Sequence, residues 1–207
     1  MIIKDYKDDK RWEGLPKDRL TELNVSPSWY LTALFKTVDS NILKNYNIAI
    51  ETGTFEGYST IYFAEIFNKV YTVEKYVKGG NMYTSKNLTE EYKKINDIHN
   101  NVEFFEGDSP KFLEQLLPTL DEPAFILLDA HAHQHTPVRE ELETIKKFSN
   151  TKDHIIMIDD TLDIDSMAGN WPSQLEIIEM LKNINPQYDV NFTEYGRRIL
   201  VAHELSK

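Results

Sequence analysis

Short apolar runs alternate along the chain with longer segments in which apolar residues recur at spacings of three and four. The runs have the length and composition of buried strands, and five of them stand at residues 48–50, 70–73, 102–105, 124–128 and 155–158. The segments between them have the period of amphipathic helices. Two further strands are predicted at residues 188–193 and 198–202, on either side of a turn at Tyr195-Gly196.

Strand and helix patterns in alternation predict one doubly wound α/β domain with a mostly parallel sheet. The run at residues 124–128 is apolar at every position, which is typical of a strand covered on both faces. No helix pattern separates the last two strands, so one of them is expected to run antiparallel to the rest. We assign the α/β domain to residues 46–207 and an N-terminal helical segment to residues 1–45.

One helix of the N-terminal segment is predicted from its start signal and its apolar spacing. Ser26 is a favourable cap and Pro27 a favourable first helical residue. Tyr30, Leu34 and Val38 follow at helical spacing. This helix is expected to lie beside the sheet or over the mouth of a site at the sheet's edge.

Composition narrows the classes of function. The 207 residues include 23 Lys and Arg against 34 Asp and Glu, and the net charge of −11 argues against binding to nucleic acid. The absence of cysteine excludes disulfides, thiolate metal ligands and a cysteine nucleophile. The start of the chain is charged and no apolar run approaches about 18 residues, so we expect a cytoplasmic protein without a membrane partner. Assembly into a homo-oligomer is left open.

The most informative stretch is residues 48–74, which has the pattern strand, glycine turn, helix, strand. Gly53 and Gly57 suit a tight turn, and their lack of Cβ would let a ligand approach the backbone. Glu74 follows the second strand, where an acid can accept hydrogen bonds from a ribose diol. The turn differs from the dinucleotide-binding fingerprint, because Phe55-Glu56 stands where the middle glycine is expected.

Acidic side chains stand at the predicted carboxyl ends of the strands, the edge at which parallel sheets bind ligands. They are Glu51, Glu74, Asp108, Asp129 and the pair Asp159-Asp160. Like charges gathered in one crevice need sugar hydroxyls, an ammonium group or a divalent cation to offset their repulsion. These needs predict a hydroxyl-rich, partly cationic ligand, and S-adenosylmethionine fits them. The alternative is that each acid only caps the helix that follows it.

Residues 51–60, Glu-Thr-Gly-Thr-Phe-Glu-Gly-Tyr-Ser-Thr, resemble the first motif of class I S-adenosylmethionine-dependent methyltransferases. More narrowly, the chain resembles the small metal-dependent O-methyltransferases of the catechol and caffeoyl-CoA type over about residues 45–205. The pair Asp159-Asp160 is equally similar to the macrocin-type sugar O-methyltransferases. The resemblance implies a Rossmann-like sheet of about seven strands with a reversed last strand, which agrees with the predicted terminal hairpin.

The resemblance also implies a cofactor site, a metal site and a hydroxylated acceptor. The residues implied to bind S-adenosylmethionine are Glu51, Gly53, Thr54, Gly57, Tyr58, Ser59, Glu74, Gly107, Asp108, Ser109 and Asp129. Those implied to hold Mg²⁺ or another hard divalent cation are Asp129, Asp159 and Asp160. The acceptor would be a small sugar-like or phenol-like molecule, whose metal-bound hydroxyl takes the methyl group in a single in-line displacement.

The catalytic base is where the chain departs from the catechol-type pattern, because Ala132 stands at the position of the family lysine. His131 or His133 is expected to take the proton beside Asp129. Two other functions stay open. One is a methyltransferase-fold binding protein without turnover, suggested by Ala132. The other is a hydrolase whose Zn²⁺ is bound by Asp129, His131 and His133. A further alternative is that His131 and His133 are polar loop residues without a role.

Overall fold

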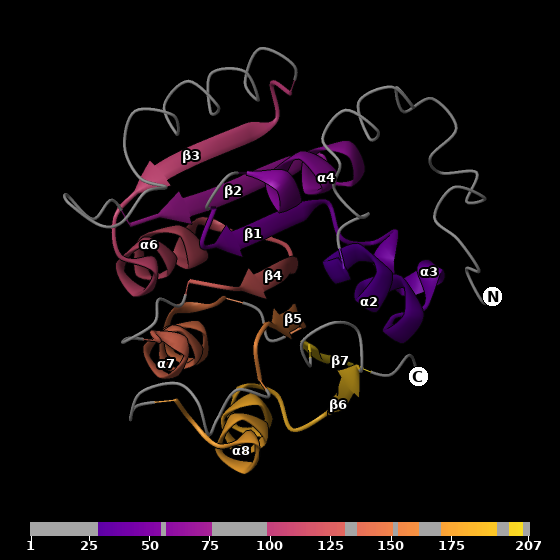
Figure 1. Cartoon of the computed structure of the whole chain (residues 1–207), viewed down its shortest axis with the longest axis vertical. Helices are drawn as coiled ribbons and strands as arrows, with labels where there is room; N and C mark the ends of the chain where they lie inside the picture. Colours follow the sequence, from indigo (N-terminus) through magenta and orange to yellow (C-terminus); the bar gives the residue numbers. More distant parts are fainter. Residues whose placement is uncertain are drawn as a thin grey trace.

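Seven strands of the described chain form one sheet in the order β3-β2-β1-β4-β5-β7-β6 (Figure 1). The computed structural model describes residues 29–54, 57–75, 99–130, 136–150, 153–161, 171–193 and 199–204. The strands are β1 (Ile48–Thr52), β2 (Lys69–Glu74), β3 (Val102–Glu106), β4 (Ala124–Leu128), β5 (Ile155–Ile158), β6 (Tyr188–Thr193) and β7 (Ile199–Glu204). The helices are α2 (Trp29–Thr37), α3 (Ser40–Leu43), α4 (Tyr58–Ile66), α6 (Ser109–Leu116), the 3₁₀ helix η3 (Leu117–Thr119), α7 (Val138–Phe148) and α8 (Gln174–Ile184).

The strand directions confirm the predicted mixed sheet. From β3 to β5 each strand pairs with its neighbour in parallel, whereas β7 runs antiparallel to both β5 and β6. The order of the strands reverses between β1 and β4, because β2 and β3 lie on one side of β1 and the later strands on the other. Ligands bind at such a switch point in open α/β sheets. The carboxyl ends of β1 and β4 therefore mark the place of a site.

Three of the strands match the sequence prediction residue for residue. β4, β5 and β6 have the predicted bounds. β1 is longer than predicted, because it continues through Glu51 to Thr52 with all five of its residues buried. Glu51 therefore lies inside the strand and not at its end, which corrects the position inferred from the sequence.

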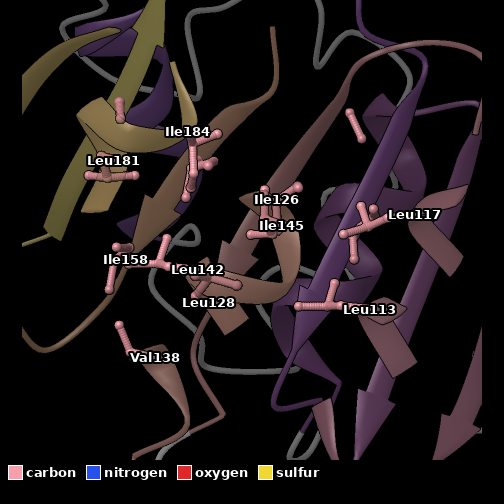
Figure 2. Packing of buried hydrophobic residues seen from close by; sticks show 14 of the residues in the cluster. Leu113, Leu117, Ile126, Leu128, Val138, Leu142, Ile145, Ile158, Leu181 and Ile184 are labelled. Carbon is pink, nitrogen blue, oxygen red and sulfur yellow. The ribbon is translucent and has the colours of Figure 1, made fainter. Parts of the chain in front are cut away.

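Helices cover both faces of the sheet (Figure 1). On one face, α6, α7 and α8 form a buried cluster with alternate strand residues, among them Ile126 and Leu128 of β4 (Figure 2). On the other face, α2, α3 and α4 surround a second cluster that includes Phe125 and Leu127. Because successive side chains of a strand point to opposite faces, β4 needs an apolar residue at every position.

Two predicted helices take the expected form within the described residues. α2 lies against the sheet, with Leu34 fully buried and Val38 nearly so. α8 begins with the predicted capping box, in which Ser173 and Glu176 each accept a hydrogen bond from the other's backbone N–H. The helix start at Ser26-Pro27 and the turn at Tyr195-Gly196 lie outside the described residues. None of the described helices has the length and hydropathy of a membrane span.

Candidate functional site

The carboxyl ends of β1, β4 and β5 are joined by backbone hydrogen bonds that continue past the strands. The Asp129 N–H donates to the carbonyl oxygen of Thr52 at 3.0 Å, and it lies 3.2 Å from Thr52 Oγ1. The Asp159 N–H donates to the carbonyl oxygen of Leu128 at 3.2 Å. The backbone of both acids is thus fixed relative to the end of β1, at the switch point of the sheet.

Two of the predicted metal ligands meet at one hydroxyl group, which α2 contributes. Tyr30 Oη lies 2.7 Å from Asp129 Oδ2 and 2.6 Å from Asp159 Oδ2. All three residues are partly buried. The two acids were predicted to come together at the strand ends, and the structure brings them together. The tyrosine between them was not predicted.

The Tyr30 hydroxyl has one proton and two carboxylate neighbours. Burial, followed by the negative charges of Asp129 and Asp159, raises the pKa of the Tyr30 phenol far above its ordinary value, so the phenol keeps its proton. A phenol has one proton to donate, but two carboxylate oxygens lie within hydrogen-bond distance of it. The phenol can therefore donate to only one of the two carboxylates at a time, and a cation nearby would offset the repulsion between them.

As a pair, Asp129 and Asp159 fit a hard divalent cation. Their Oδ2 atoms converge on one point, and Mg²⁺ is commonly held by one or two carboxylates with water in its other positions. Asp160 is 1% exposed and has a backbone φ of 55°. Within the described residues, no three His, Asp or Glu side chains form a metal-binding group, so Asp160 does not complete a triad there. Metal binding by the three acids stays a prediction.

Glu51 is a fully buried acid of β1 that contacts residues of α4 and β2. Its Oε2 accepts hydrogen bonds from the hydroxyls of Thr60 and Thr72, at 2.5 and 2.7 Å. Burial raises the pKa of Glu51 to about 7; the side chains of Ser59, Thr60 and Thr72 act to lower it, and the charge of Glu74 acts to raise it. The buried Oε1 has no hydrogen-bond partner within the described chain. Such an oxygen suits a donor on a ligand, for example an ammonium group.

The glycine turn after β1 is fixed against both neighbouring strands. The N–H groups of Gly53 and Thr54 donate to the carbonyl oxygen of Val73, at 2.9 and 3.2 Å. Gly53 has φ of 86°, and a Cβ there would lie 2.2 Å from the carbonyl oxygen of Asp129. Gly57, with φ of 77°, caps α4. Both glycines make the predicted tight turn, and the side of Gly53 on which a Cβ would lie faces the backbone of Asp129.

The ends of β2 and β3 form the side of the site that the sequence assigned to the nucleoside. Glu74 is the last residue of β2, is partly buried, and accepts the Gly107 N–H on its carbonyl oxygen at 3.0 Å. Asp108 forms an ion pair with Lys75, and Lys111 Nζ lies 3.8 Å from Asp108 Oδ2. The carboxyl ends of β2 and β3 are thus joined through Glu74 and Gly107, and Asp108 has a lysine partner that the sequence did not predict.

The remaining predicted residues are placed only in part. Ser109 is buried at the first position of α6. His131 and His133 lie outside the described residues, and so does the Tyr58 side chain. The choice of base therefore stays a prediction, and the same holds for a zinc cluster built from the histidines.

Three residues of the site were not identified from the sequence. Thr60 and Thr72 carry a weak signal, because each is a polar residue inside a largely apolar helix or strand. Tyr30 carries no such signal. It is 99 residues from Asp129 and 129 from Asp159, and only the folded chain brings them together.

Known proteins share this fold. A family model described as a methyltransferase domain matches residues 50–161. An O-methyltransferase from Bacillus cereus in complex with S-adenosylhomocysteine is 21% identical with a TM-score of 0.58, over 95% of this chain and 91% of that one. A protein provisionally named a caffeoyl-CoA O-methyltransferase, from Staphylococcus aureus, is 18% identical with a TM-score of 0.53, over 91% and 98%. A comparison with curated protein sequences finds no match.

Proposed function

Because this chain belongs to the methyltransferase domain family and has the class I S-adenosylmethionine-dependent fold, we propose that it methylates a hydroxyl group of a small sugar-like or phenol-like acceptor, with Mg²⁺ bound. The observation that carries the proposal is the convergence of the Asp129 and Asp159 carboxylates on one hydroxyl oxygen. This arrangement brings a hydroxyl and a potential cation site together at the switch point of the sheet. Family membership favours methyl transfer over the hydrolase built on His131 and His133.

Two acids support S-adenosylmethionine as the donor. Glu51 has a buried oxygen without a partner in the described chain, and its pKa responds to the charge of Glu74 one strand away. S-Adenosylmethionine carries an ammonium group and a ribose diol, and these two acids can accept hydrogen bonds from both groups. We assign the ammonium group to Glu51 and the diol to Glu74.

In the proposed reaction, the acceptor oxygen bonds to the methyl carbon while the carbon–sulfur bond breaks and S-adenosylhomocysteine leaves. Asp129 and Asp159 would hold Mg²⁺, which supplies Lewis-acid stabilisation of the acceptor oxyanion when bound. Their fixed backbone would orient the acceptor for in-line attack. The proton of the acceptor hydroxyl would pass to a base, for which His131 and His133 are the proposed residues.

Calorimetry with S-adenosylhomocysteine tests the donor site. The wild type is expected to bind, and Glu74→Ala should bind at least about tenfold more weakly, because a hydrogen bond to a charged group is worth roughly that factor. Glu103→Ala is the matched control, since Glu103 is an exposed acid of β3 whose partner is Lys69. A wild-type protein that binds no S-adenosylhomocysteine would contradict the proposal.

An assay with labelled S-adenosylmethionine and a panel of sugars and phenols tests the transfer. We expect a methylated product with Mg²⁺ present and at most a trace in EDTA. Product formation at an equal rate in EDTA would show that methyl transfer does not require Mg²⁺. Cofactor binding without any product across the panel would favour a binding protein without turnover.

A further inference from the structure

We infer that Tyr30 occupies the place of the metal ion and the acceptor hydroxyl, so that its side chain must move before either can bind; this inference rests on the proposed function. The Tyr30 hydroxyl lies 2.7 Å and 2.6 Å from the two carboxylate oxygens that would hold the ion. A cation held by Asp129 and Asp159 would compete with the phenol for these two carboxylates. The contact is therefore an autoinhibitory one, built into the fold by α2.

Packing of α2 decides which part of the chain can move. Leu31, Leu34 and Val38 are buried in the cluster on this face of the sheet, and the Tyr30 ring packs against that cluster. Lifting the helix would expose these side chains to water, which is unfavourable for each of them. The acids are thus freed by rotation of the Tyr30 side chain and not by withdrawal of α2.

The chemistry of the phenol explains why the site accepts it. A phenol hydroxyl is one of the two acceptor classes proposed for the reaction, and here it contacts the two carboxylates proposed to hold the cation. Carboxylate oxygens such as those that contact Tyr30 Oη are the ligands that a hard cation would use. Removing the hydroxyl while keeping the ring should therefore strengthen the binding of the ion.

The test measures Mn²⁺ binding from the electron paramagnetic resonance signal of the free ion, without any turnover. Tyr30→Phe is expected to bind Mn²⁺ about tenfold more tightly than the wild type, because a competing hydrogen bond to a charged group is lost. Tyr46→Phe is the matched control, since Tyr46 donates to the carbonyl oxygen of Asp153 at 2.5 Å, away from the two acids. The control should bind Mn²⁺ as the wild type does.

Thermal unfolding of the same proteins supplies a second readout. Without metal, Tyr30→Phe should melt below the wild type, because two carboxylates then face each other without the phenol proton. With Mn²⁺ it should gain more than the wild type gains, because a ligand that binds more tightly stabilises more at equal concentration. A residue that is only structural would lower both melting temperatures equally.

The outcomes separate this inference from the function on which it rests. Equal or weaker Mn²⁺ binding by Tyr30→Phe overturns the inference and leaves a metal-dependent enzyme in place. If neither protein binds Mn²⁺ while both bind S-adenosylhomocysteine, the inference and the metal fail together and the donor site stands. If the wild type binds Mn²⁺ but no S-adenosylhomocysteine, the proposed function fails. The Mn²⁺ affinity of Tyr30→Phe then still shows whether the Tyr30 hydroxyl competes with the ion.

Discussion

Gly53 lies directly against the main chain of Asp129: a Cβ at Gly53 would sit 2.2 Å from the Asp129 carbonyl oxygen and 2.7 Å from its carbonyl carbon. The glycine turn and the acid after β4 are therefore parts of one packed unit. The glycine is required by the chain's own backbone, whatever ligand the turn also contacts. The φ of 86° at Gly53 is a second reason why glycine is required there, because residues with a side chain rarely adopt that backbone conformation.

Gly53→Ala should be strongly destabilising for this reason. We expect it to lower the free energy of unfolding by more than about 3 kcal/mol, since strain at a positive φ adds to a clash with backbone atoms. Urea unfolding measures the change. Gly107→Ala is the matched control: Gly107 also has a positive φ, of 151°, but a Cβ there meets nothing within 4 Å. Similar losses for the two variants would show that the contact with Asp129 is unimportant.

The buried Glu51 predicts a dependence of stability on pH. Its pKa is raised to about 7 in the folded protein from an ordinary value of 4.5. Between these values the folded chain holds a proton that the unfolded chain has released, so the free energy of unfolding falls as pH rises. The stability that the Glu51 proton contributes is fully present below about pH 4.5 and is lost by about pH 7. Its full size is about 3 kcal/mol.

Glu51→Gln removes this titration while keeping the shape of the side chain. Urea unfolding at pH 5 and pH 8 should show the wild type losing about 2–3 kcal/mol more than the variant over that interval. The difference between the two proteins cancels the titration of all other groups. A wild type and a variant with parallel pH profiles would show that Glu51 is ionised in the fold and that its pKa is not raised.

The fold could be predicted from the sequence because each strand has a local pattern, fully apolar in β4 and β5 and alternating apolar and polar in β6. The bounds of β4, β5 and β6 followed from that pattern, and the meeting of Asp129 and Asp159 followed from topology. The end of β1 did not follow, because a charged residue normally ends an apolar run. Glu51 continues the strand since Thr60 and Thr72 supply hydrogen bonds to it inside the fold. Contacts over such distances in sequence leave no local pattern.

His154 at the start of β5 provides a test of the scaffold away from the site. Its Nδ1 accepts the N–H of Ala124 at 3.0 Å, and its Nε2 contacts the Ser149 hydroxyl. His154→Leu should lower the free energy of unfolding by about 2–3 kcal/mol, because the buried Ala124 N–H loses its acceptor. His154→Asn keeps an acceptor near the Nδ1 position and should lose less. Equal losses in urea unfolding would show that the hydrogen bond to β4 contributes little.

A crystal structure of the chain with S-adenosylhomocysteine and Mn²⁺, recorded with the anomalous signal of manganese, tests the donor and metal sites together. We expect the ribose hydroxyls on Glu74, the amino group at Glu51, and one anomalous peak between the Asp129 and Asp159 carboxylates. Tyr30 should have turned away from that peak. A nucleoside bound elsewhere on the sheet, or manganese absent from these two acids at saturating concentration, would contradict the account.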